Sequence, residues 1–445
     1  MGRELFGTDG IRGLAGKRPL DPATVHAVGV ALGRWCKTHS GSRQVVVGMD
    51  TRESGPWIAA HAAAGLASEG IGTQFAGVLS TPGIAYLTKH GDFAAGVMIS
   101  ASHNPFHDNG IKVFAHDGYK LPDAQEEILE DTIRSLWDQQ PGAAPELQPV
   151  AALDDQYADF LVSVFRGTLD GVRVAVDCWN GAASHLAPIL LERLGATVYR
   201  TGCEPDGRNI NLGCGALHTG QLSQRVVELG AHAGFAFDGD ADRCMAVSES
   251  GKLIDGDAVL YLCARHMRSR GELHGDAVVA TVMSNIGLEL ALQAEGINLV
   301  RTAVGDKYVL EEMRSRRAAL GGEQSGHVIF LDQATTGDGL LTAIRVLEAM
   351  RETGKSLEEL AAGMTKYPQT LVNVAIRERR PISDLLAVQD AIVRAERELN
   401  GRGRVLVRFS GTEPLARVMV EGPTLDQVDQ YAGQIAQAIR NEIGA

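Results

Sequence analysis

The sequence is poor in aromatic residues, and it has no paired cysteines and no long apolar run. Phe, Trp and Tyr together make up 5% of the 445 residues, and the six cysteines form no C-x-x-C pair. Zinc sites and dithiol redox motifs are usually built on such pairs, so we expect neither, and scattered cysteines are typical of reduced core residues. No apolar run approaches the about 20 residues that span a membrane. The N-terminus also lacks a basic segment followed by an apolar run. We therefore expect a cytoplasmic protein.

Positive charge is scarce as well. The 42 Lys and Arg residues are outnumbered by 55 Asp and Glu residues, which gives a formal net charge of −13. A surface of this sign repels nucleic acids and anionic membranes, so we expect neither as a partner. Neither a Walker A sequence nor G-x-G-x-x-G after a strand is present, so nucleotide binding has no support. Glycine is abundant, with 52 residues, and this excess favours tight loops at which the backbone approaches a ligand closely.

A short apolar strand followed by a loop and an amphipathic helix occurs three times. The strands cover residues 45–48, 172–176 and 278–282, and such alternation favours α/β layers around a largely parallel sheet. After residue 364 the order becomes β-α-β-β-α, which is typical of a small α+β domain. A Pro- and Gly-rich stretch at 141–149 has the composition of a linker. The sequence therefore predicts an α/β protein with three similar α/β domains containing largely parallel mixed sheets, at residues 1–150, 151–252 and 253–365, and a small C-terminal α+β domain at residues 366–445.

Three aspartates alternate with small residues directly after an apolar strand. They are Asp238, Asp240 and Asp242, and Arg243 follows them. Carboxylates at this density are the hard oxygen ligands that Mg²⁺ or Ca²⁺ prefers, and the apolar strand weakens the alternative of a solvated acidic turn. An EF-hand would place Glu249 at its twelfth position, but Arg243 stands where that loop needs glycine and no helix precedes it. The pattern therefore predicts a catalytic metal. Three carboxylates leave Mg²⁺ short of a ligand, and a phosphate oxygen is the usual one.

A polar loop at residues 100–105 holds a candidate nucleophile. Ser102 is followed by His103 and Asn104, and Lys112 lies ten residues further on. An ordinary Ser-x-x-Pro turn would look similar, and the absence of G-x-S-x-G disfavours a hydrolase. Beside an aspartate metal site, however, a serine that carries phosphate supplies the missing ligand. Lys112 can then offer a cation or a proton relay.

Two further loops have the composition of ligand sites. Glu323, Ser325 and His327 in the loop 321–327 are two residues apart and point to the same side, so they can grip sugar hydroxyls. A plain glycine-rich turn is nearly as consistent with that pattern. The second loop combines two arginines with two hydroxyls and a glycine, which suits the binding of a phosphate monoester better than a hairpin with exposed arginines does. Its residues, the phosphate clamp, are Arg408, Ser410, Gly411, Thr412 and Arg417.

With these four loops, the chain resembles the α-D-phosphohexomutase family along its whole length. The serine loop 101–105 and the metal loop 238–243 are the family's most specific motifs. Three other stretches are similar to the branch of the family that acts on glucosamine phosphates. They are residues 6–13, residues 209–211 together with 214–216, and residues 322–327. The segment 214–216 contains Cys214, and in the segment 322–327 other branches usually have a different residue at the position of Gln324.

The resemblance implies a phosphoenzyme cycle. Phosphorylated Ser102 would transfer its phosphoryl group to O1 of glucosamine 6-phosphate, giving bound glucosamine 1,6-bisphosphate, which is also an expected activator. That intermediate would turn end for end, and Ser102 would take back the 6-phosphoryl group and leave glucosamine 1-phosphate. One Mg²⁺ would be held by the three aspartates and the Ser102 phosphate.

The resemblance also implies roles for the remaining residues. The residues expected to orient the serine phosphate, handle protons or add a second cation are Arg12, His103, Lys112 and Arg243. Those expected at the sugar ring are Asp306, Lys307, Glu323, Ser325 and His327. The phosphate clamp would hold the phosphate that is not being transferred.

Two other functions remain open. The first is a mutase of glucose or mannose phosphates, because its site residues are nearly identical. The second is a non-catalytic sugar-phosphate sensor, although a sensor needs no nucleophile such as Ser102 beside a metal. The expected partner is a small hexosamine phosphate, and a homodimer is a possible assembly.

Overall fold

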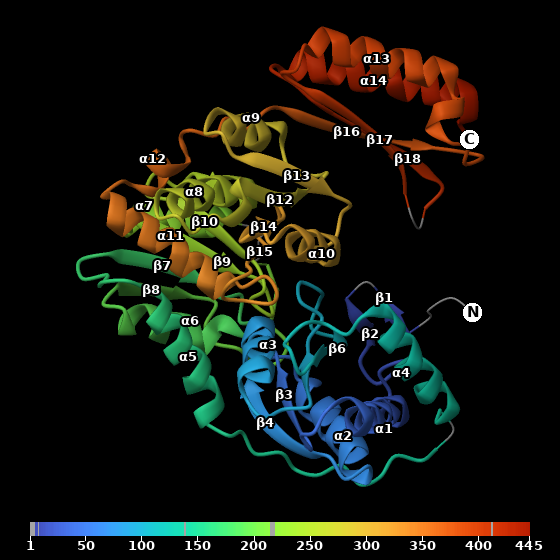
Figure 1. Cartoon of the computed structure of the whole chain (residues 1–445), viewed down its shortest axis with the longest axis vertical. Helices are drawn as coiled ribbons and strands as arrows, with labels where there is room; N and C mark the ends of the chain where they lie inside the picture. The colour runs from blue at the N-terminus through green and yellow to red at the C-terminus, as the bar shows by residue number, and fades with distance from the viewer. Residues whose placement is uncertain (1–4, 8, 138, 214–218, 411–412) are drawn as a thin grey trace. The chain divides into compact units, whose positions relative to one another are not determined.

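The computed structural model describes residues 5–7, 9–137, 139–213, 219–410 and 413–445 (Figure 1). Its contacts divide the chain into two compact units. The first unit comprises Met1–Met283 and Leu299–Ala361, and the second comprises Ser284–Asn298 and Ala362–Ala445. Each unit is described by itself below.

The first sheet of the first unit has six strands in the order β1-β2-β6-β5-β3-β4. Strand β3 is parallel to β4 and β5, whereas β1, β2, β6 and β5 pair antiparallel. The strands are β1 (Phe6–Gly7), β2 (Gly10–Leu14), β3 (Gln44–Met49), β4 (Gly72–Val78), β5 (Ala95–Ile99) and β6 (Asp108–Ala115). The helices of this region are α1 (Pro22–His39), α2 (Gly55–Ser68), α3 (Thr81–His90) and α4 (Asp123–Ser135).

The second sheet has five strands in the order β11-β10-β9-β7-β8, and its parallel strands are β9, β7 and β8. The strands are β7 (Arg173–Asp177), β8 (Thr197–Thr201), β9 (Ala233–Phe237), β10 (Cys244–Ser248) and β11 (Leu253–Ile254). The helices are α5 (Ala152–Val164), α6 (Ala183–Arg193) and α7 (Gly220–Glu228). Every residue of β9 and β10 is buried, so the loop that joins these two strands starts and ends in the core.

The third sheet has four strands in the order β13-β12-β14-β15. The strands are β12 (Ala277–Thr281), β13 (Asn298–Thr302), β14 (Leu320–Gly322) and β15 (Val328–Phe330). The helices are α8 (Gly256–Ser269), η1 (His274–Asp276), α10 (Asp306–Arg316), α11 (Gly339–Thr353) and α12 (Leu357–Ala361). The loop 323–327 joins β14 to β15, which pair antiparallel.

The second unit is built on an antiparallel sheet of three strands in the order β16-β18-β17. Its elements are α9 (Ile286–Ala294), β16 (Gln369–Ala375), η2 (Ile382–Asp384), α13 (Leu386–Leu399), β17 (Arg404–Phe409), β18 (Leu415–Glu421) and α14 (Leu425–Ile443). Apolar residues of α13 and α14, such as Val388 and Ile435, are buried with Val418 of the sheet. The buried Glu421 carboxylate accepts from the Asn285 side chain and the Ile286 N–H, which ties the segment before α9 to β18.

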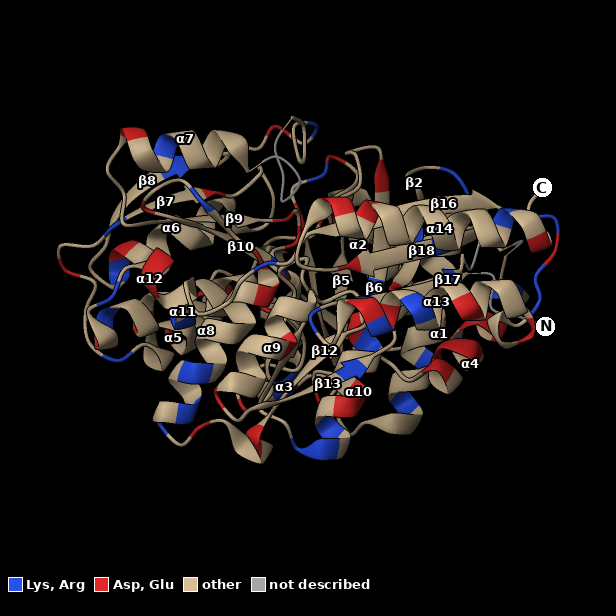
Figure 2. Ribbon diagram, turned by 90° about the horizontal axis from the view of Figure 1, so that it is seen from above, with Lys and Arg blue, Asp and Glu red and all other residues tan. Residues whose placement is uncertain are grey.

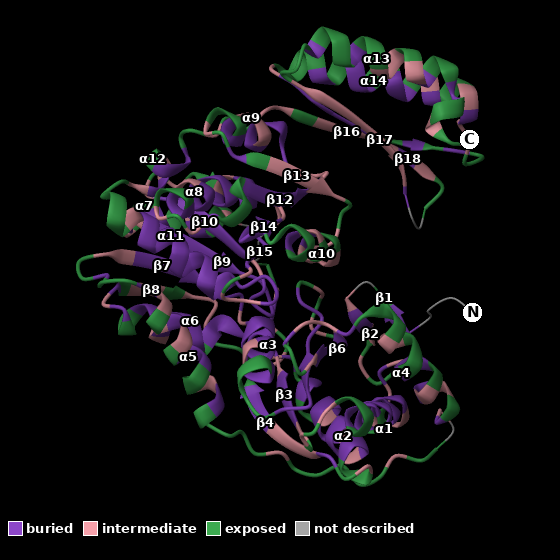
Figure 3. Cartoon of the chain, in the orientation of Figure 1, coloured by how far each residue is buried: buried purple, intermediate pink, exposed green. Residues whose placement is uncertain are grey.

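These elements confirm the predicted fold class. Each α/β region has a mixed sheet with parallel strands at one side, and the C-terminal region is a small α+β unit. The three apolar runs form β3, β7 and β12, whose central residues are buried (Figure 3), as expected for strands covered on both faces. Acidic and basic residues are interspersed on surface helices such as α10 and α13 (Figure 2). Within the described part of the chain, no helix is long and apolar enough to cross a membrane.

Candidate active site

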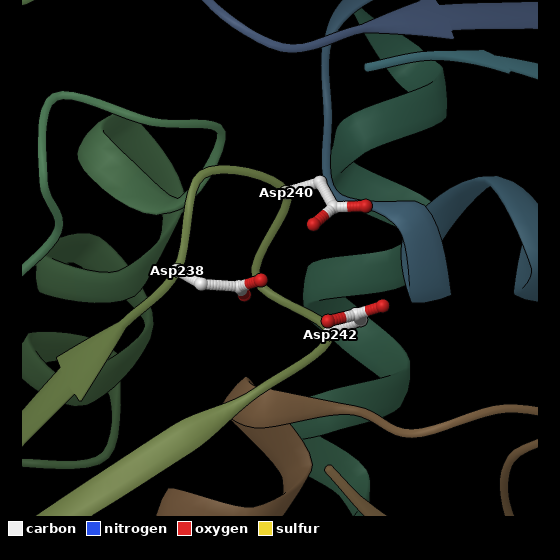
Figure 4. A group of neighbouring side chains, drawn as sticks. All are labelled: Asp238, Asp240 and Asp242. Carbon is white, nitrogen blue, oxygen red and sulfur yellow. The ribbon is translucent and has the colours of Figure 1, made fainter. Parts of the chain in front are cut away.

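The three predicted metal-binding aspartates lie together in the loop between β9 and β10. Asp238, Asp240 and Asp242 are buried, and one carboxylate oxygen of each lies within 4.8 Å of the others (Figure 4). Asp240 Oδ1 and Asp242 Oδ1 are buried without a hydrogen-bond partner among the described residues. Unpaired buried carboxylate oxygens are costly, so this cluster fits a cation that would bind them.

Burial and neighbouring charges shift the pKa values of Asp238 and Asp242 in opposite directions. Burial raises the pKa of Asp238 well above its usual value, and the neighbouring carboxylates of Asp242 and Asp240 raise it further. Burial also opposes ionisation of Asp242, but Lys112 and His327 outweigh it and hold that pKa below its usual range. The cluster therefore carries negative charge that a bound cation would stabilise.

Ser102 directs its hydroxyl at this cluster. The residue follows β5 with φ at 50°, a left-handed conformation, and its N–H donates to Ser100 Oγ at 2.9 Å. Its own Oγ donates to Asp238 Oδ2 at 2.6 Å. The two loops are in close contact, because a Cβ on Gly239 would lie 2.3 Å from the Ser102 carbonyl oxygen. The structure thus brings the predicted nucleophile and the predicted metal ligands together.

A buried arginine that the sequence analysis did not select holds the serine loop. The Arg52 guanidinium donates to the carbonyl oxygens of Ser102, Asn104 and Asp108 at 2.9–3.0 Å, and also to that of Pro105. Its Nε donates to Asp50 Oδ2 at 2.8 Å, and both side chains are fully buried. Arg52 could have been found from its position, because Asp50 and Arg52 closely follow β3. Ligand sites usually form at the carboxyl ends of parallel strands.

Asn211 supports the same loop from the second sheet region. Its side-chain amide donates to the carbonyl oxygens of Ser102 at 2.8 Å and Asn104 at 3.0 Å. The sequence analysis used the segment 209–211 only to assign a branch of the family. Cys214 and the rest of 214–216 lie outside the described residues.

Lys112 lies at the centre of an ionic network. Its Nζ is 2.8 Å from Asp240 Oδ2, 3.0 Å from Asp9 Oδ2 and 3.8 Å from Asp242 Oδ2. Burial opposes its charge, but the carboxylates of Asp240, Asp9 and Asp242 together raise the pKa of Lys112 well above its usual value. Lys112 is therefore a fixed cation in this conformation.

The network extends through Asp9 to other predicted residues. Arg12 Nη2 lies 2.5 Å from Asp9 Oδ2, and Lys120 Nζ joins Asp9 Oδ1 at 2.5 Å to Asp306 Oδ2 at 2.6 Å. Asp9 and Lys120 were not selected as site residues from the sequence, although Asp9 lies in the stretch 6–13 that was used to assign a branch of the family. Lys307 is separate from this network and pairs with Asp123 at 2.5 Å.

The loop between β14 and β15 contributes two candidate sugar ligands. Glu323 Oε1 accepts from the Gly305 N–H at 3.3 Å, and Ser325 Oγ is buried without a hydrogen-bond partner among the described residues. An unpaired hydroxyl of this kind is available to a ligand. Arg243 is the last residue of the metal loop, and its Nε lies 3.7 Å from Asp242 Oδ1. The His103 side chain is exposed.

The ring of His327 lies between the metal loop and the segment before α11. It is buried, its Nδ1 is 3.6 Å from Asp242 Oδ2, and its Nε2 accepts from the Gly337 N–H at 3.1 Å. Both ring nitrogens therefore face protein groups. The contact of His327 with the sugar ring stays a prediction, and in this conformation the imidazole ring supports the metal loop.

The described residues of the phosphate clamp lie in the second unit. Arg408 of β17 and Arg417 of β18 are directly opposite each other in the antiparallel pair. Arg417 Nη2 is 3.5 Å from Ser410 Oγ and 3.1 Å from Glu413 Oε2. Two like charges in opposite positions destabilise a strand pair, so an anion between them would be favourable. Gly411 and Thr412 lie outside the described residues.

Another cation, Arg379, was missed from the sequence. Its Nη2 donates to the carbonyl oxygens of Ser410 at 2.7 Å and Glu413 at 3.0 Å, so it fixes the backbone at both ends of the clamp loop.

Comparison with known proteins agrees with this fold. Four profiles of phosphoglucomutase/phosphomannomutase domains match consecutive parts of the chain. Alpha/beta/alpha domain I matches residues 3–139, domain II residues 155–251, domain III residues 255–367, and the C-terminal domain residues 371–438. The chain belongs to the phosphoglucomutase/phosphomannomutase family, and the resemblance seen in its motifs is confirmed.

Curated relatives with high sequence identity to this chain are phosphoglucosamine mutases. The chain is 56% identical over 445 residues to a phosphoglucosamine mutase of Solibacter usitatus, with 100% of both chains covered. It is 49% identical over 452 residues to a phosphoglucosamine mutase of Koribacter versatilis, covering 99% of this chain and 98% of the relative. Among solved structures, a phosphoglucomutase/phosphomannomutase family protein from Burkholderia thailandensis has the same fold, with a TM-score of 0.81, 23% identity and 99% of both chains covered.

Proposed function

We propose that this protein is a phosphoglucosamine mutase that interconverts glucosamine 6-phosphate and glucosamine 1-phosphate. The observation that carries the proposal is the Ser102 hydroxyl, 2.6 Å from Asp238 in a buried cluster of three aspartates, in a chain similar over its whole length to phosphoglucosamine mutases. A mutase of this kind is an intramolecular phosphotransferase, and so an isomerase. The cytoplasm is the compartment we propose for it, because its substrates are sugar phosphates.

In the proposed cycle, Ser102 carries the phosphoryl group. The serine gives it to O1 of glucosamine 6-phosphate, and the resulting glucosamine 1,6-bisphosphate turns end for end while bound. Ser102 then accepts the 6-phosphoryl group, and glucosamine 1-phosphate leaves. Glucosamine 1,6-bisphosphate added from outside would act as an activator, because it can phosphorylate an empty Ser102.

The aspartate cluster is proposed to hold one Mg²⁺ with the Ser102 phosphate as a fourth ligand. Three carboxylates with two unpaired oxygens are the hard donors that this ion prefers. When bound, Mg²⁺ would neutralise charge on the transferring phosphoryl group. Lys112 and Arg243 would add fixed positive charge beside the same phosphate, and Arg12 would reach it from β2.

Proton transfer at Ser102 and at the sugar hydroxyls is assigned to groups that can approach them. His103 is exposed next to the serine, so a substrate could reach its imidazole. Lys112 is buried between Asp9 and Asp240, and this supports a role as a permanent cation rather than a carrier of protons.

The sugar and the second phosphate are assigned to two loops. Glu323 and Ser325 are proposed to hold the 3- and 4-hydroxyls, which lie alike in both orientations of the ring. Asp306, Lys307 and His327 would contact other ring substituents. The phosphate clamp, with Arg408 and Arg417, would bind the phosphate that is not being transferred.

We also propose domain boundaries near residues 150, 252 and 366. The family profiles change at 139–155, 251–255 and 367–371, which supports these positions. A homodimer is proposed as the assembly, to be tested by light scattering of the purified full chain.

The proposed substrate is tested by comparing rates on three sugar phosphates. We expect kcat/KM to be highest for glucosamine 6-phosphate, ahead of glucose 6-phosphate and mannose 6-phosphate. Equal or better use of glucose 6-phosphate would favour the glucose or mannose mutase and leave the reaction type intact. Binding of all three without turnover would favour the non-catalytic sensor.

A further inference from the structure

Two cysteines that are 25 positions apart in the sequence lie just beyond the carboxyl ends of neighbouring strands in the second sheet. Cys178 follows β7 and Cys203 follows β8, and the two strands are parallel with Asp177 opposite Thr201. Both cysteines are free, and one acceptor, the Thr201 carbonyl oxygen, binds both the Cys178 N–H and Cys203 Sγ. Cys178 is fully buried, whereas Cys203 is half-buried and can be reached from solvent. The two cysteines are too far apart in the sequence to form a C-x-x-C motif, so the sequence alone does not indicate this dithiol.

The backbone holds the two thiols in place from both sides. The Cys178 N–H donates to the Thr201 carbonyl oxygen at 3.1 Å, and the Asn180 N–H donates to that of Gly202 at 2.6 Å. Cys203 Sγ donates to the Thr201 carbonyl oxygen at 3.3 Å. Gly202 has φ at 60°, and a Cβ there would lie 2.7 Å from the Trp179 nitrogen. The two loops that carry Cys178 and Cys203 are therefore in close contact.

We propose that Cys178 and Cys203 form a thiol–disulfide exchange site that reacts with low-molecular-weight disulfides. The Cys203 thiolate attacks one sulfur of the external disulfide, which breaks its S–S bond and releases one thiolate. Cys178 loses its proton to solvent and attacks the Cys203 sulfur, which releases the second thiolate and forms the Cys178–Cys203 disulfide. Two protein thiols are oxidised, and one external disulfide is reduced to two thiols.

The acid–base properties of the pair agree with this order of attack. The neighbouring Cys178 thiol lowers the pKa of Cys203, and the Arg200 guanidinium lowers it further against the effect of burial. Burial raises the pKa of Cys178 well above its usual value. A half-buried thiol of lowered pKa is the nucleophile, and a buried partner is the group that resolves the mixed disulfide.

Closure of this disulfide would act on the candidate active site. The Trp179 carbonyl oxygen accepts from the Asn211 N–H at 3.2 Å, and Asn211 in turn holds the Ser102 carbonyl oxygen at 2.8 Å. The Ala182 N–H donates to the carbonyl oxygen of Gly239 in the metal loop at 2.8 Å. A Cys178–Cys203 disulfide would join the loop 178–182 covalently to the segment after β8. Because this loop contacts both Asn211 and the metal loop, turnover falls when the bond forms.

The covalent site is tested on the reduced full-length protein with oxidised glutathione. Alkylation, digestion and mass spectrometry should identify one cross-link, Cys178–Cys203, with the loss of two hydrogen atoms and recovery by dithiothreitol. Cys36 and Cys263 are matched controls, because burial raises the pKa of each thiol to about 12. Cys203 should react at least about tenfold faster than either control, because the thiolate fraction falls tenfold for each unit of pKa.

Two variants separate the attacking thiol from the resolving one. Cys178→Ala should accumulate glutathione on Cys203 as a stable mixed disulfide, and Cys203→Ser should leave Cys178 unmodified. Thermal unfolding of both variants checks that they are folded. A glutathione adduct that persists on wild-type Cys203, a cross-link to Cys214, or no reaction at Cys203 would overturn the proposal.

The effect on catalysis is measured separately. The oxidised wild type should show a lower kcat that dithiothreitol restores, while Cys203→Ser treated in the same way should keep its rate. An unchanged kcat in fully cross-linked enzyme would overturn the inferred effect on turnover. Because the cross-link is detected by mass, its outcome does not depend on the proposed sugar-phosphate activity.

Discussion

Ser102 is the residue on which the proposed chemistry depends. Its backbone is held in the left-handed region, at φ 50°, a conformation that costs about 1–2 kcal/mol in a residue other than glycine. Arg52 and Asn211 bind the carbonyl oxygen of Ser102, and Ser100 binds its N–H. This conformation is therefore maintained by contacts on both sides, and it directs the hydroxyl at Asp238.

Ser102→Ala should lower turnover by roughly a thousandfold or more, because no neighbouring group can replace a positioned phosphoryl carrier. The intact mass of the wild type should include a species heavier by one phosphoryl group, and the variant should lack it. Thermal unfolding is the control for folding. More than trace activity in the variant would remove Ser102 from its proposed role.

The metal ligands allow a second test at this scale. Chelation should stop turnover reversibly, with Mg²⁺ restoring it, and Asp240→Asn should weaken the binding of Mg²⁺ because it removes one ligand charge. Asp92→Asn, which alters an exposed carboxylate, is the matched control and should behave as the wild type. Turnover by the metal-free enzyme would make the aspartate loop a structural element.

Among the elements, α11 begins at a carboxylate that also binds a tyrosine. Asp338 caps the helix by accepting from the Leu341 N–H at 2.9 Å, and its other oxygen accepts from Tyr157 Oη at 2.7 Å. Both side chains are buried. Burial raises the pKa of Asp338 to about 6, against the partial relief that these hydrogen bonds give.

This raised pKa predicts how stability depends on pH. Between about pH 4 and pH 6 the folded protein binds the Asp338 proton and the unfolded chain does not, so this residue's contribution to stability decreases as the pH rises through that range. The full cost above that range is about 3 kcal/mol. Asp338→Asn keeps an oxygen that can cap the helix but does not titrate.

The difference in melting temperature between Asp338→Asn and the wild type should therefore shift in favour of the variant as the pH rises from about 4.5 to 8. Thermal unfolding of both proteins across this range measures the difference. Parallel pH profiles would show that Asp338 is not protonated in the folded protein near pH 5.

At the scale of the whole molecule, the sequence predicts those features whose functional residues lie close together in one short segment. The three aspartates follow a single strand, and Ser102 lies in a recognisable loop, so both could be predicted. The strand runs were also predicted, because burial on both faces makes them continuously apolar.

The remaining features depend on contacts between distant segments. Arg52 contacts Ser102 across 50 positions and Asn211 does so across 109, and no local pattern records such a pairing. The same holds for Lys120, which joins Asp9 to Asp306, and for the Cys178–Cys203 pair. His327 was selected because it alternates with Glu323 and Ser325, but its neighbours Asp242 and Gly337 decide where the ring lies.

The division into two units leads to the last prediction, which concerns the phosphate clamp. The substrate carries its phosphate on C6 in one direction of the reaction and on C1 in the other, while Ser102 stays in the first unit. A single phosphate site can serve both directions if the sugar turns end for end during the cycle. Arg408 and Arg417, opposite each other on β17 and β18, are the proposed site.

Arg408→Ala should weaken the use of glucosamine 6-phosphate and glucosamine 1-phosphate alike. Loss of a charge-assisted contact to phosphate costs about 2–3 kcal/mol, so kcat/KM should fall by roughly 30- to 150-fold in each direction. Phosphorylation of Ser102, measured by intact mass, should persist because the serine belongs to the first unit. Arg402→Ala, which removes an exposed arginine of the second unit, is the matched control and should leave both rates unchanged. A defect confined to one direction would mean that the two orientations of the sugar use different phosphate sites, and a single clamp could not then explain the reaction.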